Sequence, residues 1–172
     1  MSERAEYEQL STLVTLLGKL LYCTSEVKSL TNCVPMLCCF ASHAIETGLG
    51  YGAWLHGEAV STGMVMAAEL SLRMGLVDTE IVTRTTEVLR RAGLPVSLEN
   101  SHAEAQLGSD EYKKRILALT KSRFLQLMSV DKKVSDGRLS LVLLQGPLGC
   151  CVITNEFDEA ALGTTLERYC SN

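Results

Sequence analysis

The chain has 172 residues, of which 47% are hydrophobic and 21% are charged. This length and composition are typical of about one globular domain with an apolar core, and they exclude a disordered chain. The formal net charge is −4 and no run of basic residues occurs, so we expect no nucleic-acid partner. No uncharged apolar stretch of about 18 residues occurs, so we expect no membrane span. Only 5% of the residues are aromatic and three are prolines, which favours helices over strands.

The seven cysteines are an odd number, and no CxxC motif occurs among them. Neither a disulfide framework nor a four-cysteine zinc site has this pattern, so we expect reduced thiols in an intracellular compartment. The first ten residues, MSERAEYEQL, contain acidic side chains and no apolar core. They therefore fit neither a secretory signal nor a transit peptide.

The first quarter of the chain contains one clear element. Residues 4–22 have apolar side chains near the helical period, which predicts an amphipathic helix. Residues 30–42 are apolar, rich in cysteine and contain Pro35, and they fit no helix or strand pattern. A helix is expected to begin at His43, and three glycines spaced as GxGxG interrupt it over residues 48–52.

The middle of the chain predicts two helices. Residues 56–74 are apolar on nearly every side, which is typical of a helix buried inside a bundle. Asp78 is a suitable N-cap for a second helix over residues 79–92. Gly93 and Pro95 then predict its end.

The last third predicts a helix, a hairpin and a closing helix. Residues 110–130 have a helical apolar pattern. Residues 139–145 and 150–154 read as two strands joined by a Gly-Pro turn, and Asp158 can cap a helix over residues 157–170. The chain is therefore expected to be mainly α, with one small β-hairpin.

Two histidines flank the glycine-rich turn, His43 before it and His56 after it. The turn can fold the chain back so that both imidazoles face one cavity, and a metal needs such ligands from different elements, usually with a carboxylate. Glu46 and Glu58 lie nearby, and Glu58 can instead orient an imidazole. The alternative is a pair of helix-terminal histidines with ordinary hydrogen bonds. The glycines do not form a dinucleotide-binding fingerprint, which needs GxGxxG between a strand and a helix; they allow positive φ angles and close helix packing.

A second candidate site is the sequence Asp131, Lys132 and Lys133 at the end of a predicted helix. Lysines that leave a helix can bind a phosphate or a carboxylate. The alternative is a solvated charged turn. The third histidine, His102, lies in a polar stretch and is expected to be solvated.

Three motifs occur in order: HAIETGLGYGAWLHGE, RRAGLP and SVDKKVSDGRLSLVLLQGPLG. Together they closely resemble the C-terminal, metal- and substrate-binding domain of the 3-dehydroquinate synthase family, and they are most similar to its plant and algal plastid forms. The resemblance covers about residues 43–170. It implies a helical C-terminal domain over residues 43–172 and a non-matching N-terminal segment over residues 1–42.

The resemblance implies a lyase of the shikimate pathway, which leads to the aromatic amino acids. Such enzymes convert the seven-carbon sugar acid phosphate DAHP into 3-dehydroquinate with loss of phosphate. The family binds NAD in a separate N-terminal domain, holds zinc or another divalent metal in the helical domain, and forms homodimers. Its plant members imply a location in the chloroplast.

The resemblance also implies roles for particular residues. The family pattern before HAIE is G-H-T-x-G-H, and His43 matches its second histidine, which lies in the active site. His56 matches a zinc ligand, and Cys39 stands at the position of another, the first histidine of the pattern. Lys132 and Lys133 match the DKK element that meets the anionic substrate.

Parts of the family pattern have no counterpart in these residues. The glutamate that completes the zinc site and the NAD-binding domain are both without a match, so we expect an incomplete metal site, no NAD site and no activity of this chain alone. We interpret residues 1–42 as the result of a truncated gene, a mistaken exon boundary or a retained intron. Without a transit peptide, the alternative location is the cytoplasm. The alternative functions are a non-catalytic pseudoenzyme or interaction fragment, another sugar phosphate cyclase, or a relative of iron-type alcohol dehydrogenases.

Overall fold

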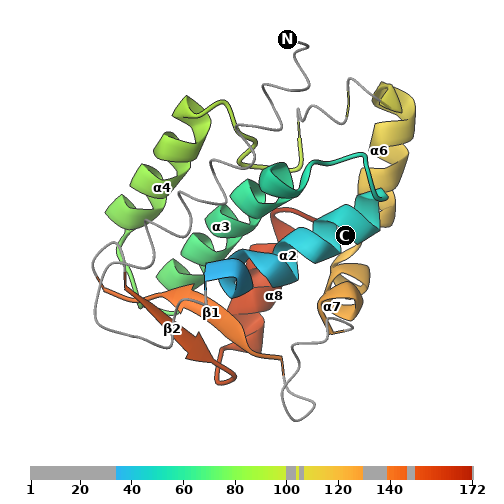
Figure 1. Cartoon of the computed structure of the whole chain (residues 1–172). Helices are drawn as coiled ribbons and strands as arrows, with labels where there is room; N and C mark the ends of the chain where they lie inside the picture. The colour runs from blue at the N-terminus through green and yellow to red at the C-terminus, as the bar shows by residue number, and fades with distance from the viewer. Residues whose placement is uncertain (1–33, 100–103, 105–106, 130–138, 147–149, 172) are drawn as a thin grey trace.

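The computed structural model describes residues 34–99, 104, 107–129, 139–146 and 150–171, with the backbone alone for residues 34–40 and 153. The helix predicted over residues 4–22 lies outside these ranges. The described elements are α2 (Val34–Leu49), α3 (His56–Arg73), α4 (Thr79–Arg91), α6 (Ser109–Ala118), α7 (Lys121–Ser129), β1 (Leu141–Leu144), β2 (Cys151–Thr154) and α8 (Glu159–Glu167) (Figure 1). This arrangement confirms a mainly α fold with one hairpin. None of the described helices combines the length and hydropathy that a membrane crossing needs.

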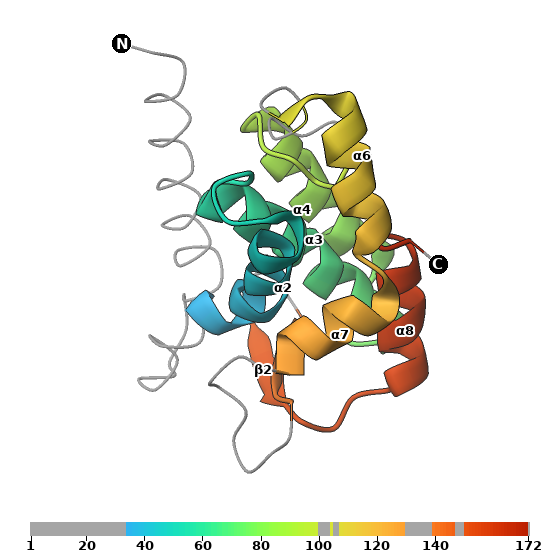
Figure 2. The ribbon, with the colours of Figure 1, turned by 90° about the vertical axis from the view of Figure 1, so that its right-hand side faces the viewer.

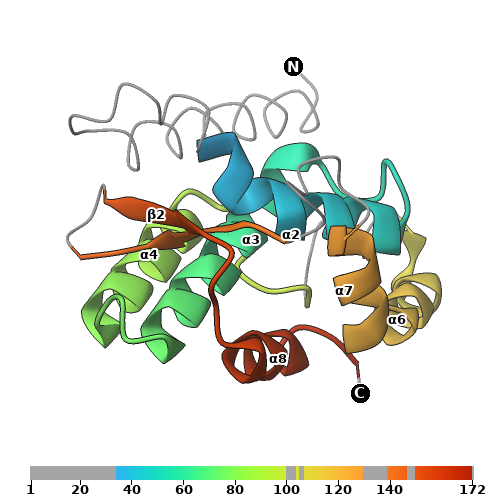
Figure 3. The same cartoon turned by 90° about the horizontal axis from the view of Figure 1, so that it is seen from below.

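Helix α3 lies at the centre of the structure. Every residue from Gly57 to Ser71 is buried, because α2, α4, α8 and β1 all pack against this helix. Figure 3 shows α2 and α8 on opposite sides of α3. Met66 and Leu70 of α3 belong to the larger apolar cluster, which also includes residues of α2, α7 and α8. The predicted burial of this helix is therefore confirmed.

The hairpin pairs β1 with β2 in antiparallel register, with Leu141 opposite Thr154 and Leu144 opposite Cys151. All four residues of β1 are buried. A buried hydroxyl joins this strand to α3: Ser71 Oγ donates to the carbonyl of Ala67 at 2.7 Å and accepts from the N–H of Leu144 at 2.9 Å. The Ser71 side chain thus satisfies a buried strand N–H.

Helix α2 begins earlier than the sequence pattern predicted. Residues 34–42 fit no helix or strand pattern in the sequence, yet they form the first half of this helix. Pro35 falls in the first turn, where its missing N–H costs no intrahelical hydrogen bond. The prediction that a helix begins at His43 is therefore wrong, because His43 lies within α2.

The single helix predicted over residues 110–130 is two helices, α6 and α7, with a break at Leu119 and Thr120. The C-terminal segment docks at this break, where Ser171 N–H donates to the Leu119 carbonyl at 3.3 Å. Thr120 then starts α7, since its carbonyl accepts from Phe124 N–H at 2.8 Å. Figure 2 shows the bend between α6 and α7 beside the C-terminal end of the chain. Cys170, next to Ser171, is buried by this docking.

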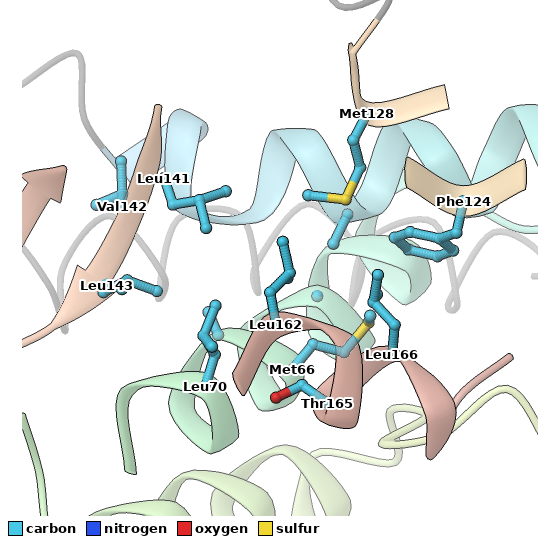
Figure 4. A pocket seen from close by; sticks show the side chains of 13 residues that line it. Met66, Leu70, Phe124, Met128, Leu141, Val142, Leu143, Leu162, Thr165 and Leu166 are labelled. Carbon is cyan, nitrogen blue, oxygen red and sulfur yellow. The ribbon is translucent and has the colours of Figure 1, made fainter. Parts of the chain in front are cut away.

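A small apolar cavity of about 40 Å³ remains between α3, α7, α8 and β1 (Figure 4). Leu70, Phe124 and Leu162 are among its lining side chains, and its one polar side chain is Thr165. The Thr165 hydroxyl donates within its own helix to Ala161 at 2.8 Å. A water molecule needs two or more polar partners, so the lining favours a dry cavity.

We predict that Ser71→Ala lowers the free energy of unfolding by about 1–3 kcal/mol, because it leaves the buried Leu144 N–H without an acceptor. The matched control is Thr164→Ala: Thr164 makes the same type of bond, to the Ala160 carbonyl at 2.9 Å, on the exposed side of α8. This control should change the free energy by less than about 0.5 kcal/mol. Urea unfolding followed by circular dichroism measures both. Equal effects of the two substitutions would contradict the role given to Ser71.

Candidate metal centre

The turn between α2 and α3 brings together residues on the two helices. His43 and Glu46 are three residues apart on α2, so they lie on the same face of that helix. His56 is the first residue of α3. Between them Gly50 has a φ of +93°, which suits glycine, and its carbonyl accepts from the Ala53 N–H at 3.1 Å.

Trp54 anchors this turn in the core. Its side chain is 2% exposed, and the indole Nε1–H donates to the Tyr112 hydroxyl of α6 at 3.2 Å. Tyr112 in turn donates to the carbonyl of Leu98. The chain just before His56 is therefore held by buried hydrogen bonds to distant segments.

Three donor atoms, one each from His43, Glu46 and His56, all lie within 4.8 Å of one another. The two imidazole centroids are 6.1 Å apart, and His56 Nδ1 lies 3.2 Å from Glu46 Oε2. The His56 side chain is 48% exposed and the Glu46 side chain 14%. The group is thus accessible from solvent on the histidine side, while its carboxylate is mostly covered.

The Glu46 carboxylate raises the pKa of His56 above its ordinary value. The hydrogen bond to Glu46 is the largest cause, its negative charge adds to the effect, and partial burial of His56 opposes it. A metal binds the neutral imidazole, so a cation at this group must displace the proton that Glu46 helps to retain.

The two carboxylates near the turn have different positions. Glu58 is fully buried, and its Oε2 accepts from the Leu55 N–H at 2.8 Å. It therefore fixes the first turn of α3, as the N3 residue of a capping box does. Glu46, in contrast, faces His56. Sequence reasoning offered Glu58 as the carboxylate that orients an imidazole, whereas the carboxylate that contacts His56 Nδ1 is that of Glu46.

The other residues singled out from the sequence are not placed at this group. Cys39 lies in α2, four residues before His43, and its side chain is outside the described residues. Lys132, Lys133 and His102 also lie outside the described residues. Sequence reasoning left Glu46 without a definite role. Its spacing of three residues from His43 in the HAIE motif could have indicated that both side chains lie on the same face of a helix.

The donor set fits a divalent metal ion. Two imidazole nitrogens and one carboxylate oxygen are ligands that zinc accepts, and catalytic zinc sites commonly use three protein ligands and leave a position open. The three donors come from two helices that are packed together, and two of them are solvent-exposed. An ion could therefore enter without disrupting the core.

Two solved structures have the same fold. One is 2-epi-5-epi-valiolone synthase from Streptomyces hygroscopicus subsp. jinggangensis 5008 with NAD+ and Zn2+ bound, at a TM-score of 0.51 and 20% identity over 78% of this chain and 32% of that chain. The other is 2-deoxy-scyllo-inosose synthase complexed with carbaglucose-6-phosphate, NAD+ and Co2+, at a TM-score of 0.57 and 16% identity over 91% of this chain and 51% of that chain. The described residues thus have the fold of a helical domain found in these two synthases.

The family can be stated more narrowly from sequence comparison. Residues 40–134 match the family model for the C-terminal part of 3-dehydroquinate synthase. The chloroplastic 3-dehydroquinate synthase of Arabidopsis thaliana is 47% identical over 127 residues, which are 74% of this chain and 25% of that protein. The synthase of Nitrosococcus oceani is 50% identical over 126 residues, which are 73% of this chain and 30% of that protein. The chain belongs to the 3-dehydroquinate synthase C-terminal family, and the matched part is about a quarter to a third of these relatives.

We predict that Glu46→Gln lowers the pKa of His56, because the substitution removes the negative charge and weakens the hydrogen bond that favour the imidazolium. An NMR titration of the imidazole resonances in the metal-free chain measures the shift. Glu87→Gln is the control, since Glu87 pairs with Arg91 on α4 and is not part of this group. An unchanged His56 pKa in Glu46→Gln would show that the two side chains do not interact in solution.

Proposed function

We propose that this chain provides the metal- and substrate-binding part of a 3-dehydroquinate synthase, the lyase that converts the sugar acid phosphate DAHP into 3-dehydroquinate with loss of phosphate. The observation that carries the proposal is the cluster of His43, Glu46 and His56 in a chain 47% identical to such a synthase. The proposal extends to NAD as the second cofactor of the reaction. NAD is bound in both solved structures of this fold, as their descriptions state.

In this proposal His43, Glu46 and His56 would hold the metal ion, since their three donor atoms lie within 4.8 Å of one another. A divalent metal such as zinc supplies Lewis-acid polarisation of substrate oxygens when it is bound. Glu46 orients the His56 ring through the 3.2 Å contact with Nδ1. The exposed His43 ring is open to a substrate on the solvent side, in keeping with the active-site role that the HAIE motif implies.

Residues outside the described part complete the proposed site. Cys39 stands where the family has another zinc-ligating histidine, and a cysteine thiolate is a good zinc ligand. Lys132 and Lys133 are proposed to bind the phosphate or carboxylate of the substrate, because an ammonium group pairs well with such anions.

We further propose that the family domain spans residues 43–172, that residues 1–42 are a separate segment, and that the domain takes part in a homodimer. The family match over residues 40–134 supports a boundary in this region. Relatives from Arabidopsis thaliana and Solanum lycopersicum are chloroplastic proteins, which supports a plastid location. Sequencing the transcript upstream of the HAIE codons tests whether residues 1–42 are encoded in the mRNA.

We predict that the chain binds one divalent ion, Zn2+ or Co2+, and that His56→Ala weakens its affinity at least about 10-fold through loss of an imidazole ligand. Elemental analysis after dialysis gives the stoichiometry, and competition with a chromophoric chelator gives the affinity. Glu87→Ala, which removes an exposed carboxylate of α4, is the control and should leave the affinity unchanged. A wild-type chain that binds no ion would contradict the proposal and favour a non-catalytic interaction fragment.

We also predict that these 172 residues, assayed by themselves with DAHP, NAD and Zn2+, release no phosphate. The reaction needs a bound nicotinamide, whereas the match covers only 25–30% of the relatives' length. A phosphate-release assay against a full-length synthase tests this. Turnover near that of the full-length enzyme would overturn the prediction and place the NAD site within this chain.

A further inference from the structure

Arg115 of α6 binds the end of the helix that carries His43 and Glu46. Its guanidinium Nη1 donates to the carbonyl of Leu49 at 2.7 Å, across 66 residues of sequence. Leu49 is the last residue of α2, where carbonyls lack helical partners and the helix dipole is negative. A charged donor at this position both satisfies the carbonyl and complements the dipole.

The turn is built to admit this guanidinium. A Cβ atom on Gly50 would lie 2.5 Å from Arg115 Nη1, so a larger residue at this position would displace the guanidinium from where it lies. Two residues earlier, a Cβ on Gly48 would lie 2.5 Å from Leu119 Cδ1. The end of α2 is therefore seated closely against α6 and the residue that follows it.

Arg115 is itself held in place by its own helix. Its Nε donates to Glu111 Oε1 at 2.9 Å, and its side chain is 33% exposed. This ion pair leaves Nη1 directed at α2. A lysine at the same position could reach one of these two oxygens but not both in the fixed geometry of a guanidinium.

We propose that Arg115 is a positioning residue for the metal centre, which rests on the function proposed above. Glu46 lies three residues before Leu49 and His56 seven residues after it, so the end of α2 sets the distance between the two side chains. Arg115 fixes that end without being one of the three donors. Metal sites tolerate only small errors in ligand position, so loosening this contact weakens binding.

If Arg115 only stabilised α6, its substitution would lower stability without changing metal binding. Arg91 provides the comparison, since it makes the same type of ion pair with the residue four positions earlier, Glu87, on the exposed side of α4. No bond from Arg91 to another element is present among the described residues. An arginine that only stabilises its own helix would behave as Arg91 does.

The test compares Arg115→Ala, Arg115→Lys, Arg91→Ala and Glu111→Gln in the 172-residue chain, using Co2+ as the probe. The readouts are the Co2+ affinity, the visible absorption bands of the bound Co2+, and the free energy of unfolding without metal. We expect Arg115→Ala to weaken Co2+ binding about 10-fold and to change the absorption bands, the size of effect seen for residues that orient metal ligands. Added guanidinium ion at a concentration that does not unfold the chain should restore part of the affinity.

The Co2+ affinity of Arg115→Lys should lie between that of the wild type and that of Arg115→Ala. This variant keeps the test valid if Arg115→Ala does not fold. Arg91→Ala should leave the Co2+ affinity and bands unchanged, because within the part of the chain that the structure describes Arg91 pairs only with Glu87 of its own helix. Glu111→Gln should weaken Co2+ binding less than Arg115→Ala does, because it loosens the ion pair that directs Nη1 at α2 without removing the guanidinium. The inference is overturned if the Arg115 variants lose stability but bind Co2+ with wild-type affinity and bands. If the wild-type chain binds no Co2+, the proposed function fails first, and the positioning role fails with it.

Discussion

The burial of α3 on every side is the constraint on which the rest of the structure depends. A helix whose residues from Gly57 to Ser71 all avoid water has no exposed face, so α2, α4, α8 and β1 must each cover one side. Two of the polar side chains enclosed in this way bind other parts of the chain: Ser71 bonds to β1, and Glu69 Oε1 pairs with Arg168 at 2.7 Å. His56, at the start of the helix, is exposed, so this buried helix also places one donor of the candidate metal centre at the surface.

The candidate metal centre owes its geometry to packing more than to its own side chains. Its donors lie on two helices that contact each other along their length, and the connecting turn is tied to α6 through Trp54 and Arg115. Glu46 is mostly covered while His56 is about half exposed. A partly desolvated carboxylate interacts more strongly with a neighbouring imidazole than a surface pair does, because less water screens it. The fold thus prepares a local negative charge where a cation is expected.

Much of the fold could be predicted because its signals are local. The apolar pattern of α3, the N-caps Asp78 and Asp158, and the two strands of the hairpin are all readable within a few residues. The start of α2 was missed because the apolar, cysteine-rich stretch around Pro35 has no helical period. The break after α6 was missed because the apolar pattern continues through it, and the contact made there, from Ser171 to Leu119, comes from the other end of the chain. The same limit applies at the metal centre, where the motif points to the histidines but only the three-dimensional arrangement separates Glu46 from Glu58 and brings in Arg115.

The docking of the C-terminal segment also has a chemical consequence for Cys170. Burial raises the pKa of this thiol to about 11, so almost none of it is thiolate at neutral pH. Thiolates, not thiols, react with peroxides and alkylating agents, and Cys150 and Cys151 are only partly covered. Cys170 is therefore shielded from oxidation as long as Ser171 remains paired with Leu119. Its rate of alkylation consequently reports how often the end of the chain detaches from the domain.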